Sequence, residues 1–138
     1  MKEDLRALVL YRLEQAADSV DSAQILLDKG KCRSSVNRSY YAMFYATIAL
    51  LAIRSLTTSK HSGVIALFDR DFVKTGLFDK TLSRWLHEAF DLRLRADYRE
   101  MFQVSPDRAR AVLEHASGFV SEVQEQITNL MSSDSDAS

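Results

Sequence analysis

A chain of 138 residues is long enough for one domain with a single hydrophobic core, and a second domain is not expected. Hydrophobic residues make up 46% and charged residues 27% of the sequence, which is ordinary for a globular protein and argues against a disordered or fibrous class. The net charge of −1 at pH 7 gives the whole protein no attraction to a polyanion.

Helices are the expected secondary structure, because one proline and four glycines are all that interrupt the chain. The first helix is predicted over residues 2–29, where apolar side chains recur every three or four positions. This stripe consists of Leu5, Val9, Leu13, Ala16, Val20, Ala23 and Leu27. Gly30 follows it and favours a left-handed C-cap.

The second helix, predicted over residues 33–55, is apolar on more than one side. One stripe consists of Val36, Tyr40, Met43, Thr47 and Leu50. A second stripe consists of Tyr41, Phe44, Ile48, Leu51 and Ala52. A helix with this pattern lies in the centre of a bundle or at an interface.

A connection over residues 55–60 is expected next, with Thr58 or Ser59 as the N-cap of a short helix over residues 61–72. Gly76 closes a second loop. The short helix therefore lies between two longer ones in the sequence.

The fourth helix is predicted over residues 80–99. Ser105 and Pro106 are a strong signal for the start of a fifth helix, which is expected to end at about Leu130. The predicted fold is an all-α antiparallel four-helix bundle with an additional short helix.

The expected domain covers residues 1–130, and the polar, acidic tail over residues 131–138 is expected to be disordered. The single cysteine, Cys32, cannot form an intramolecular disulfide, and the start of the chain lacks the pattern of a secretory signal. No apolar run approaches the length of about 18 residues that suggests a membrane span. A cytoplasmic protein without membrane association is the expectation.

Signatures of common enzyme classes are absent from the sequence. No Gly-rich phosphate loop, cysteine pair or zinc-protease spacing occurs, and the histidines at positions 61, 87 and 115 are far apart in the chain. No metal site and no cofactor is expected.

The basic residues are concentrated in the first half of the chain. No acidic residue lies between Asp28 and Asp69. Six basic residues occupy that interval: Lys29, Lys31, Arg33, Arg38, Arg54 and Lys60. They create a local positive field unless acidic residues of other helices neutralise it, and the sequence leaves both alternatives open.

The side chains with the clearest chemical potential lie in the second helix. Arg38 and Tyr45 are seven residues apart and therefore lie on nearly the same face, with Tyr41 between them. A guanidinium group binds phosphate through two hydrogen bonds, and phenol rings stack on bases. The alternative is that Arg38 pairs with a carboxylate of another helix and the tyrosines belong to the core.

Four segments, in this order, resemble the HEPN domain family. They are NRSYYAMFY (37–45), SKHSGVIALF (59–68), FVKTG (72–76) and LRLRADY (92–98). The resemblance covers about residues 5–128 and is closest to the small stand-alone bacterial and archaeal proteins of the UPF0332 type. It implies a helical bundle, a homodimer, and for many members a toxin or companion subunit beside a minimal (MNT-type) nucleotidyltransferase, which acts as antitoxin.

The resemblance also implies a site for RNA. Active members of the family are metal-independent RNases with an arginine and a histidine that are separated by four to six intervening residues and face the second copy across the dimer cleft. In this chain the arginine matches Arg38, the polar residue beside it matches Asn37, and Tyr45 stands where the histidine would be after six intervening residues.

The replacement of that histidine changes the expected activity. An imidazole with a pKa of about 6.5 exchanges protons near neutral pH, whereas a phenol with a pKa of about 10 is a poor base. Cleavage is therefore expected to be much weakened or absent, while Arg38 can still bind phosphate. RNA or nucleotide binding is predicted through Asn37, Arg38, Tyr41, Tyr45 and Lys60.

His61 is the candidate to replace the missing base. It lies near the predicted start of the short helix, next to Lys60, where backbone N–H groups favour an anion. The predicted catalytic residues are thus Arg38 and His61, with packing at the helix start as the alternative role of His61. Asp97 is expected to pair with a basic residue such as Arg38 or Arg95.

Three functional hypotheses follow. The first is an RNA- or nucleotide-binding HEPN protein of a toxin–antitoxin or nucleotidyltransferase pair. The second is a non-catalytic substrate-binding or regulatory subunit of an MNT-type nucleotidyltransferase, and an exposed Tyr98 or Tyr45 that accepts a nucleotide from such a partner is a related alternative. The third is a plain dimeric interaction module, which a buried ion pair at Arg38 without an open cleft would favour.

Overall fold

The computed structural model describes residues 1–99 and 101–137, with side chains up to residue 133. These residues form helices and no strand. The elements are α1 (Glu3–Asp28), α2 (Cys32–Ile53), α3 (His61–Phe68), the π-helical turn η1 (Asp69–Val73), α4 (Lys80–Tyr98) and α5 (Pro106–Ala137). The predicted all-α class is confirmed.

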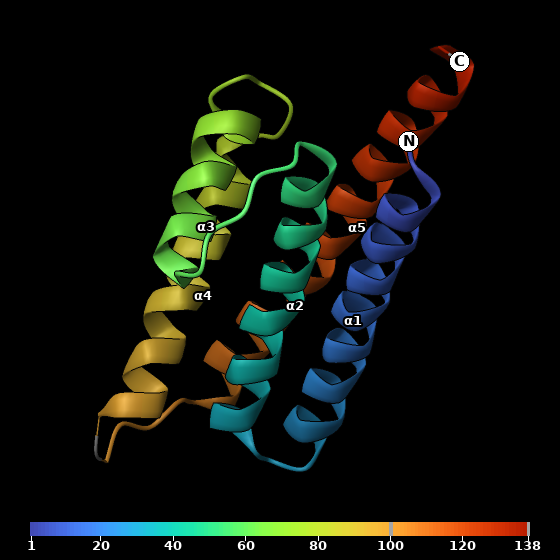
Figure 1. Cartoon of the computed structure of the whole chain (residues 1–138). Helices are drawn as coiled ribbons and strands as arrows, with labels where there is room; N and C mark the ends of the chain where they lie inside the picture. The colour runs from blue at the N-terminus through green and yellow to red at the C-terminus, as the bar shows by residue number, and fades with distance from the viewer. Residues whose placement is uncertain (100, 138) are drawn as a thin grey trace.

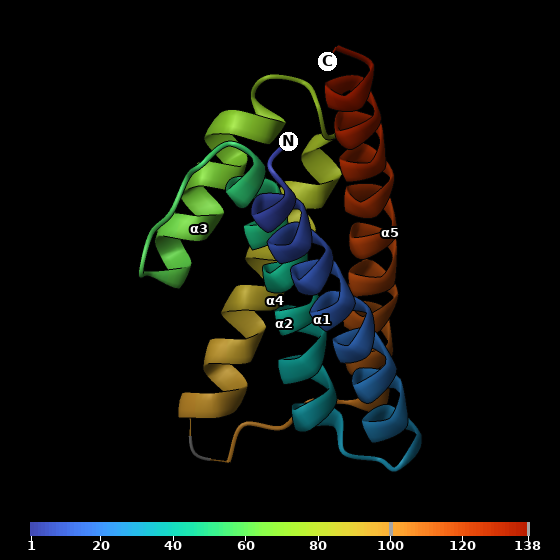
Figure 2. The same ribbon diagram turned by 45° about the vertical axis from the view of Figure 1, so that its right-hand side comes forward.

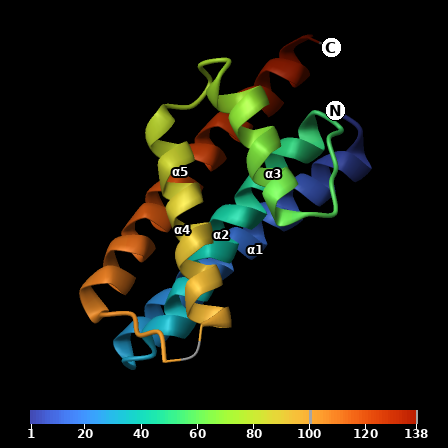
Figure 3. The same cartoon turned by 90° about the vertical axis from the view of Figure 1, so that its left-hand side faces the viewer.

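The four long helices α1, α2, α4 and α5 form an antiparallel bundle, and α3 packs against α2 and α4 at the edge of this bundle (Figures 1 and 2). The connection after α2 returns along the bundle before α3 begins, so α3 and α4 run in opposite directions (Figure 3). Helix α2 is central, since it packs against α1, α3, α4 and α5. The residues of α2 therefore face several neighbours at once.

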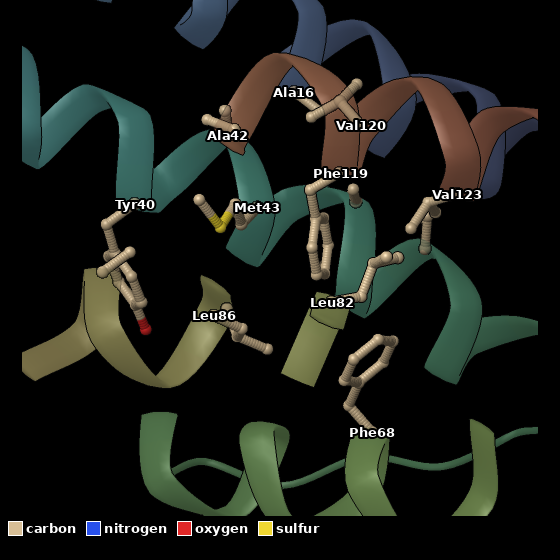
Figure 4. Close-up of a cluster of buried hydrophobic side chains, with 14 of the residues drawn as sticks. Ala16, Tyr40, Ala42, Met43, Phe68, Leu82, Leu86, Phe119, Val120 and Val123 are labelled. Carbon is tan, nitrogen blue, oxygen red and sulfur yellow. The ribbon is translucent and has the colours of Figure 1, made fainter. Parts of the chain in front are cut away.

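The first predicted stripe of α2 is fully inaccessible to solvent, as in Val36, Tyr40 and Leu50. The second stripe is half-buried apart from Leu51, so one side of α2 is open to solvent along its length. Figure 4 shows part of the hydrophobic core that the buried stripe of α2 contacts, with Phe119 of α5 and Phe68 of α3 pointing into one cluster.

The helix ends follow the predicted signals in two cases and differ in one. Gly30 has φ +76° and ends α1, as expected. The Ser105 Oγ accepts a hydrogen bond from the Arg108 N–H (3.1 Å) and caps α5, as expected. The predicted N-cap of α3 is wrong although its start at His61 is right, because Lys60 occupies the N-cap position without a side-chain bond. Thr58 Oγ1 instead accepts a hydrogen bond from the Lys60 N–H (3.4 Å).

Helix α5 continues through residues 131–137, where a disordered tail was expected. Position 138 and the side chains from 134 onward lie outside the described residues. None of the described helices combines the length and hydrophobicity that crossing a membrane requires.

Candidate functional site

Arg38 projects from the half-buried side of α2 and is held by its neighbour in the sequence. The Asn37 Oδ1 accepts hydrogen bonds from Arg38 Nε (3.1 Å) and from one of its terminal nitrogens (2.8 Å). The Asn37 amide in turn donates to Asp97 Oδ2 of α4 (3.3 Å). Because a neutral amide separates the carboxylate from the guanidinium group, Arg38 is oriented without being neutralised.

No ion pair joins Arg38 to a carboxylate within residues 1–99 and 101–133. The alternative in which Arg38 is paired with a carboxylate of another helix is therefore not what the structure shows. Asp97 pairs with a basic residue, as expected, but its partner is Arg93 (3.0 Å) and neither Arg38 nor Arg95, since Arg95 pairs with Asp91 (2.8 Å).

The ring of Tyr41 is the point at which the candidate residues meet. The Arg38 guanidinium carbon lies 4.9 Å and that of Arg93 5.4 Å from the centroid of the Tyr41 ring. The rings of His61 and Tyr45 have their centroids 5.8 Å and 5.9 Å from that of Tyr41. The structure thus brings Arg38, Tyr45 and His61 around one half-buried phenol ring.

His61 reaches this cluster from the first position of α3. Its Nδ1 shares a hydrogen bond with the Tyr40 hydroxyl (2.8 Å), and its ring stacks on Phe44 with centroids 4.3 Å apart. Its Nε2 has no hydrogen-bond partner among the described residues. The imidazole is thus fixed by the hydrogen bond at Nδ1 and by stacking on Phe44, and its Nε2 is left for a ligand.

The protonation states suit proton exchange at His61. Burial, with a smaller contribution from Arg93, lowers the pKa of His61 below its ordinary value of 6.5, so the imidazole is neutral at pH 7. Burial also raises the pKa of Tyr40 far above its usual range, although Arg93 opposes the shift. Tyr40 therefore keeps its proton and acts as a hydrogen-bond partner rather than as a base.

Arg93 is a member of the site that sequence reasoning missed. Only 14% of its side chain is exposed, and it donates a hydrogen bond to the Tyr41 hydroxyl (3.2 Å). Its four-residue spacing from Asp97 was an available signal for their ion pair. Its approach to Tyr41 had no signal in the sequence, because that contact joins α4 to α2.

Lys60 and Tyr98 are not drawn into this cluster. Lys60 is exposed beside His61, and its side chain makes no contact with Arg38 or Tyr41 among the interactions of the described residues. Tyr98 is 74% exposed at the end of α4. The sequence-based role of Lys60 in phosphate binding thus rests on charge and not on an observed contact.

An open groove with a volume of about 560 Å³ lies beside Arg38. Its lining comes from the end of α1, the start of α2 and the end of α4: Leu26, Arg33, Ser34, Asn37, Arg38, Ala96 and Asp97. Within the described part of the chain, no group of three or more metal-ligating side chains is placed to hold a metal ion. The site can thus offer charge, hydrogen bonds and stacking surfaces to an anionic ligand.

Comparison with known proteins identifies related sequences over nearly the whole chain. The sequence model of the HEPN domain matches residues 9–126. A UPF0332 protein of Thermotoga maritima is 37% identical over 89% of this chain and 93% of its own length. A protein of Methanocaldococcus jannaschii named as a candidate toxin is 28% identical over 95% of this chain and 97% of its own length. A UPF0332 protein of Archaeoglobus fulgidus is 32% identical over 84% and 92%.

Proposed function

The chain belongs to the HEPN domain family, and on that basis we propose that it is the toxin-type member of a cytoplasmic toxin–antitoxin pair and binds RNA phosphate through Arg38. The resemblance to a relative named as a candidate toxin supports the biological class. The orientation of Arg38 by Asn37, with no carboxylate paired to it among the described residues, is the observation that carries the binding role.

The chemistry of the site supports phosphate as the ligand. A guanidinium group that is held by Nε and one terminal nitrogen still has N–H donors directed away from Asn37, and these suit the oxygens of a phosphate. Tyr41 and Tyr45 are half-buried beside it, and a phenol ring is a group on which a base can stack. Arg93 adds a second positive charge next to Tyr41.

A second copy of the chain is the proposed partner across the half-buried side of α2. Ile48, Ala52 and Leu56 are partly exposed there, and with Leu8 of α1 they line an apolar groove of about 230 Å³. Leu8 is 41% exposed, which suits a surface that an interface covers. In a dimer formed through this surface, the two Arg38 sites would face one cleft, and an MNT-type nucleotidyltransferase is the proposed antitoxin.

RNA cleavage in this site would depend on His61, because a tyrosine stands at position 45 in place of the motif histidine. In that reaction the His61 Nε2 takes the proton of a ribose 2′-hydroxyl, whose oxygen attacks the adjacent phosphorus. The protonated His61 then returns a proton to the departing 5′-oxygen, and the products are a 2′,3′-cyclic phosphate and a 5′-hydroxyl end. Arg38 would stabilise the charge on the phosphate. We propose that this cleavage is slow compared with that of a member with the motif histidine.

The test is cleavage and gel-shift binding of one labelled structured RNA without metal. Wild type, Arg38→Ala, His61→Gln and Tyr45→His are compared, with Arg84→Ala as the matched control because Arg84 is an exposed arginine near the start of α4. Arg38→Ala is expected to abolish binding without loss of helix content. Unchanged binding would refute the assignment of the site.

The cleavage result separates the proposed toxin from the alternatives. Slow wild-type cleavage that His61→Gln removes and Tyr45→His accelerates supports an RNase. Arg38-dependent binding without any cleavage would instead assign the protein to a non-catalytic subunit of a nucleotidyltransferase. A plain interaction module is disfavoured, because Arg38 lies beside an open groove and is not locked in an ion pair among the described residues.

A further inference from the structure

A second groove extends the site past Arg38 toward the start of α2. It has a volume of about 470 Å³ and shares Arg33 and Ser34 with the groove beside Arg38. Its remaining lining includes Lys31 and Gln103, the latter from the segment that leads into α5. Because the two grooves share two lining residues, they adjoin at the start of α2, and we call the two together the channel.

The channel is basic along its length. Lys31, Arg33 and Arg38 line it, and Asp97 is its one acidic lining residue among those described. Asp97 is already paired with Arg93 and accepts a hydrogen bond from Asn37. The positive charges of the channel therefore face solvent without a free carboxylate to neutralise them.

The donors in the channel are available to a ligand. Lys31 and Arg33 are exposed, and one terminal nitrogen of Arg33 donates to the Ala96 carbonyl oxygen of α4. A guanidinium group has five N–H donors, so Arg33 retains several after making this bond. The bond to α4 holds the charge of Arg33 over the channel.

The residues of the channel continue the line of the Tyr41 cluster. Positions 45, 41, 38 and 34 of α2 and its N-cap Lys31 follow one another at steps of three or four and share one face. Arg33 lies off this face, but its side chain lines both grooves. Fourteen residues of helix rise about 21 Å, and at about 3.4 Å per stacked nucleotide this length spans about six nucleotides. A single mononucleotide would occupy only a part of it.

We propose that the channel holds a single RNA strand of several nucleotides, with bases at Tyr41 and Tyr45 and successive phosphates at Arg38, Arg33 and Lys31. This inference rests on the proposed function, since it extends the same site. A single strand fits better than a duplex, because the aromatic rings can stack only on unpaired bases. The channel then sets the length of RNA that the protein prefers.

The test is fluorescence anisotropy with labelled 2′-O-methyl RNA oligomers of three and twelve nucleotides, which lack the 2′-hydroxyl nucleophile and cannot be cleaved. Affinity is measured over a range of salt concentrations. The variant is Lys31→Ala/Arg33→Ala, and the matched control is Lys80→Ala/Arg84→Ala, which removes the same charges from the far end of α4.

The deciding measurement is how the affinity for the 12-mer depends on salt concentration. Loss of two phosphate contacts should reduce the slope of log K against log salt by about 1.4 for a single strand, and the 3-mer should be unaffected. The control should change neither. Equal slopes for the channel variant and the control, or binding of a 12-base-pair duplex as tight as that of the single strand, would refute the proposal.

Two further variants distinguish a failure of the channel proposal from a failure of the proposed function. Lys31→Ala alone leaves the bond of Arg33 to Ala96 intact and should reduce the slope by about 0.7. Arg38→Ala should weaken both oligomers, because it acts at the shared centre of the site. If Arg38→Ala weakens neither oligomer, the proposed function fails, whereas a failure confined to the channel variants leaves that function standing.

Discussion

Two aromatic clusters lie at opposite ends of α3, and they share similar ring packing but differ in exposure. The phenyl cluster consists of Phe68, Phe72, Phe78 and Phe119, and its rings are at most 4% exposed. The tyrosine cluster consists of Tyr40, Tyr41, Phe44, Tyr45 and His61, and all but Tyr40 are half-buried. Ring centroids lie 5.4–6.4 Å apart in the first and 4.3–6.2 Å apart in the second.

The difference between the clusters lies in what accompanies the rings. Two arginines approach Tyr41, and His61 shares a hydrogen bond with Tyr40. In the phenyl cluster the side chains carry no polar atom, and the nearest cation is the exposed Arg54 over Phe72 (5.3 Å). Aromatic packing is therefore common to both clusters; partial exposure, cations and hydrogen-bonding groups distinguish the cluster that we propose as a site.

The largest expected effect comes from breaking the phenyl cluster. Phe119→Ala should lower the free energy of unfolding by about 3–5 kcal/mol, because it leaves a cavity beside Phe68. Urea unfolding measures the change, and Phe119→Leu should cost less than about 1.5 kcal/mol. RNA affinity of the folded fraction should not change. A loss of affinity in a folded variant would show that the two clusters are coupled.

A smaller effect on stability and a larger one on binding are expected at Tyr41. Tyr41→Leu removes the ring that Arg38 and Arg93 approach, and loss of one base-stacking surface should weaken RNA binding by about 1–3 kcal/mol. Tyr41→Phe keeps the ring and loses only the bond from Arg93, so it should retain most of the affinity. Anisotropy and urea unfolding on the same samples measure both quantities. Equal loss of affinity in both variants would contradict a stacking role.

Tyr40→Phe should have a modest effect, since it removes one hydroxyl from a ring that stays buried. The loss of its bond to His61 should lower the free energy of unfolding by about 1 kcal/mol. RNA binding should persist, while any cleavage should decrease because the imidazole is no longer fixed. Cleavage at the wild-type rate would show that this hydrogen bond does not position His61.

The smallest effect is expected in the titration of His61. The titration midpoint of His61, followed by NMR, should lie below 6.5. Arg93→Gln should raise this midpoint, because it removes the charge that makes the smaller contribution to lowering the pKa. Because the unfolded state binds this proton more readily, His61 should reduce stability as pH falls from about 6.5 toward the folded pKa. His61→Gln should reduce that pH dependence. A wild-type midpoint above 6.5 would contradict the proposed neutral base.

The sequence was sufficient to locate the helices and part of the site. The stripe from Val9 to Leu27 and the cap at Ser105 are local signals, and α1 and α5 begin within about one residue of where these signals place them. Arg38, Tyr41 and Tyr45 could be placed on one face because they share a helix. The short helix was found as well, although its N-cap was assigned to the wrong residue.

The contacts between helices could not be obtained in this way. Arg93 reaches Tyr41 from α4, and His61 reaches Tyr40 from α3, 21 residues further along the chain. These contacts depend on how α3 and α4 pack on α2 and on which rotamers the packing allows. Neither quantity leaves a pattern in the residues themselves.

The sequence by itself thus determined the helical bundle, the basic α2 and the loss of the motif histidine at Tyr45. The tertiary structure decided that Asp97 pairs with Arg93, that Asn37 orients Arg38 without neutralising it, and that His61 lies over the same phenol ring. The physical reason is the distance along the sequence over which each feature is encoded. Helical periodicity is encoded every three or four residues, whereas a site built from three helices exists only once their side chains have packed together.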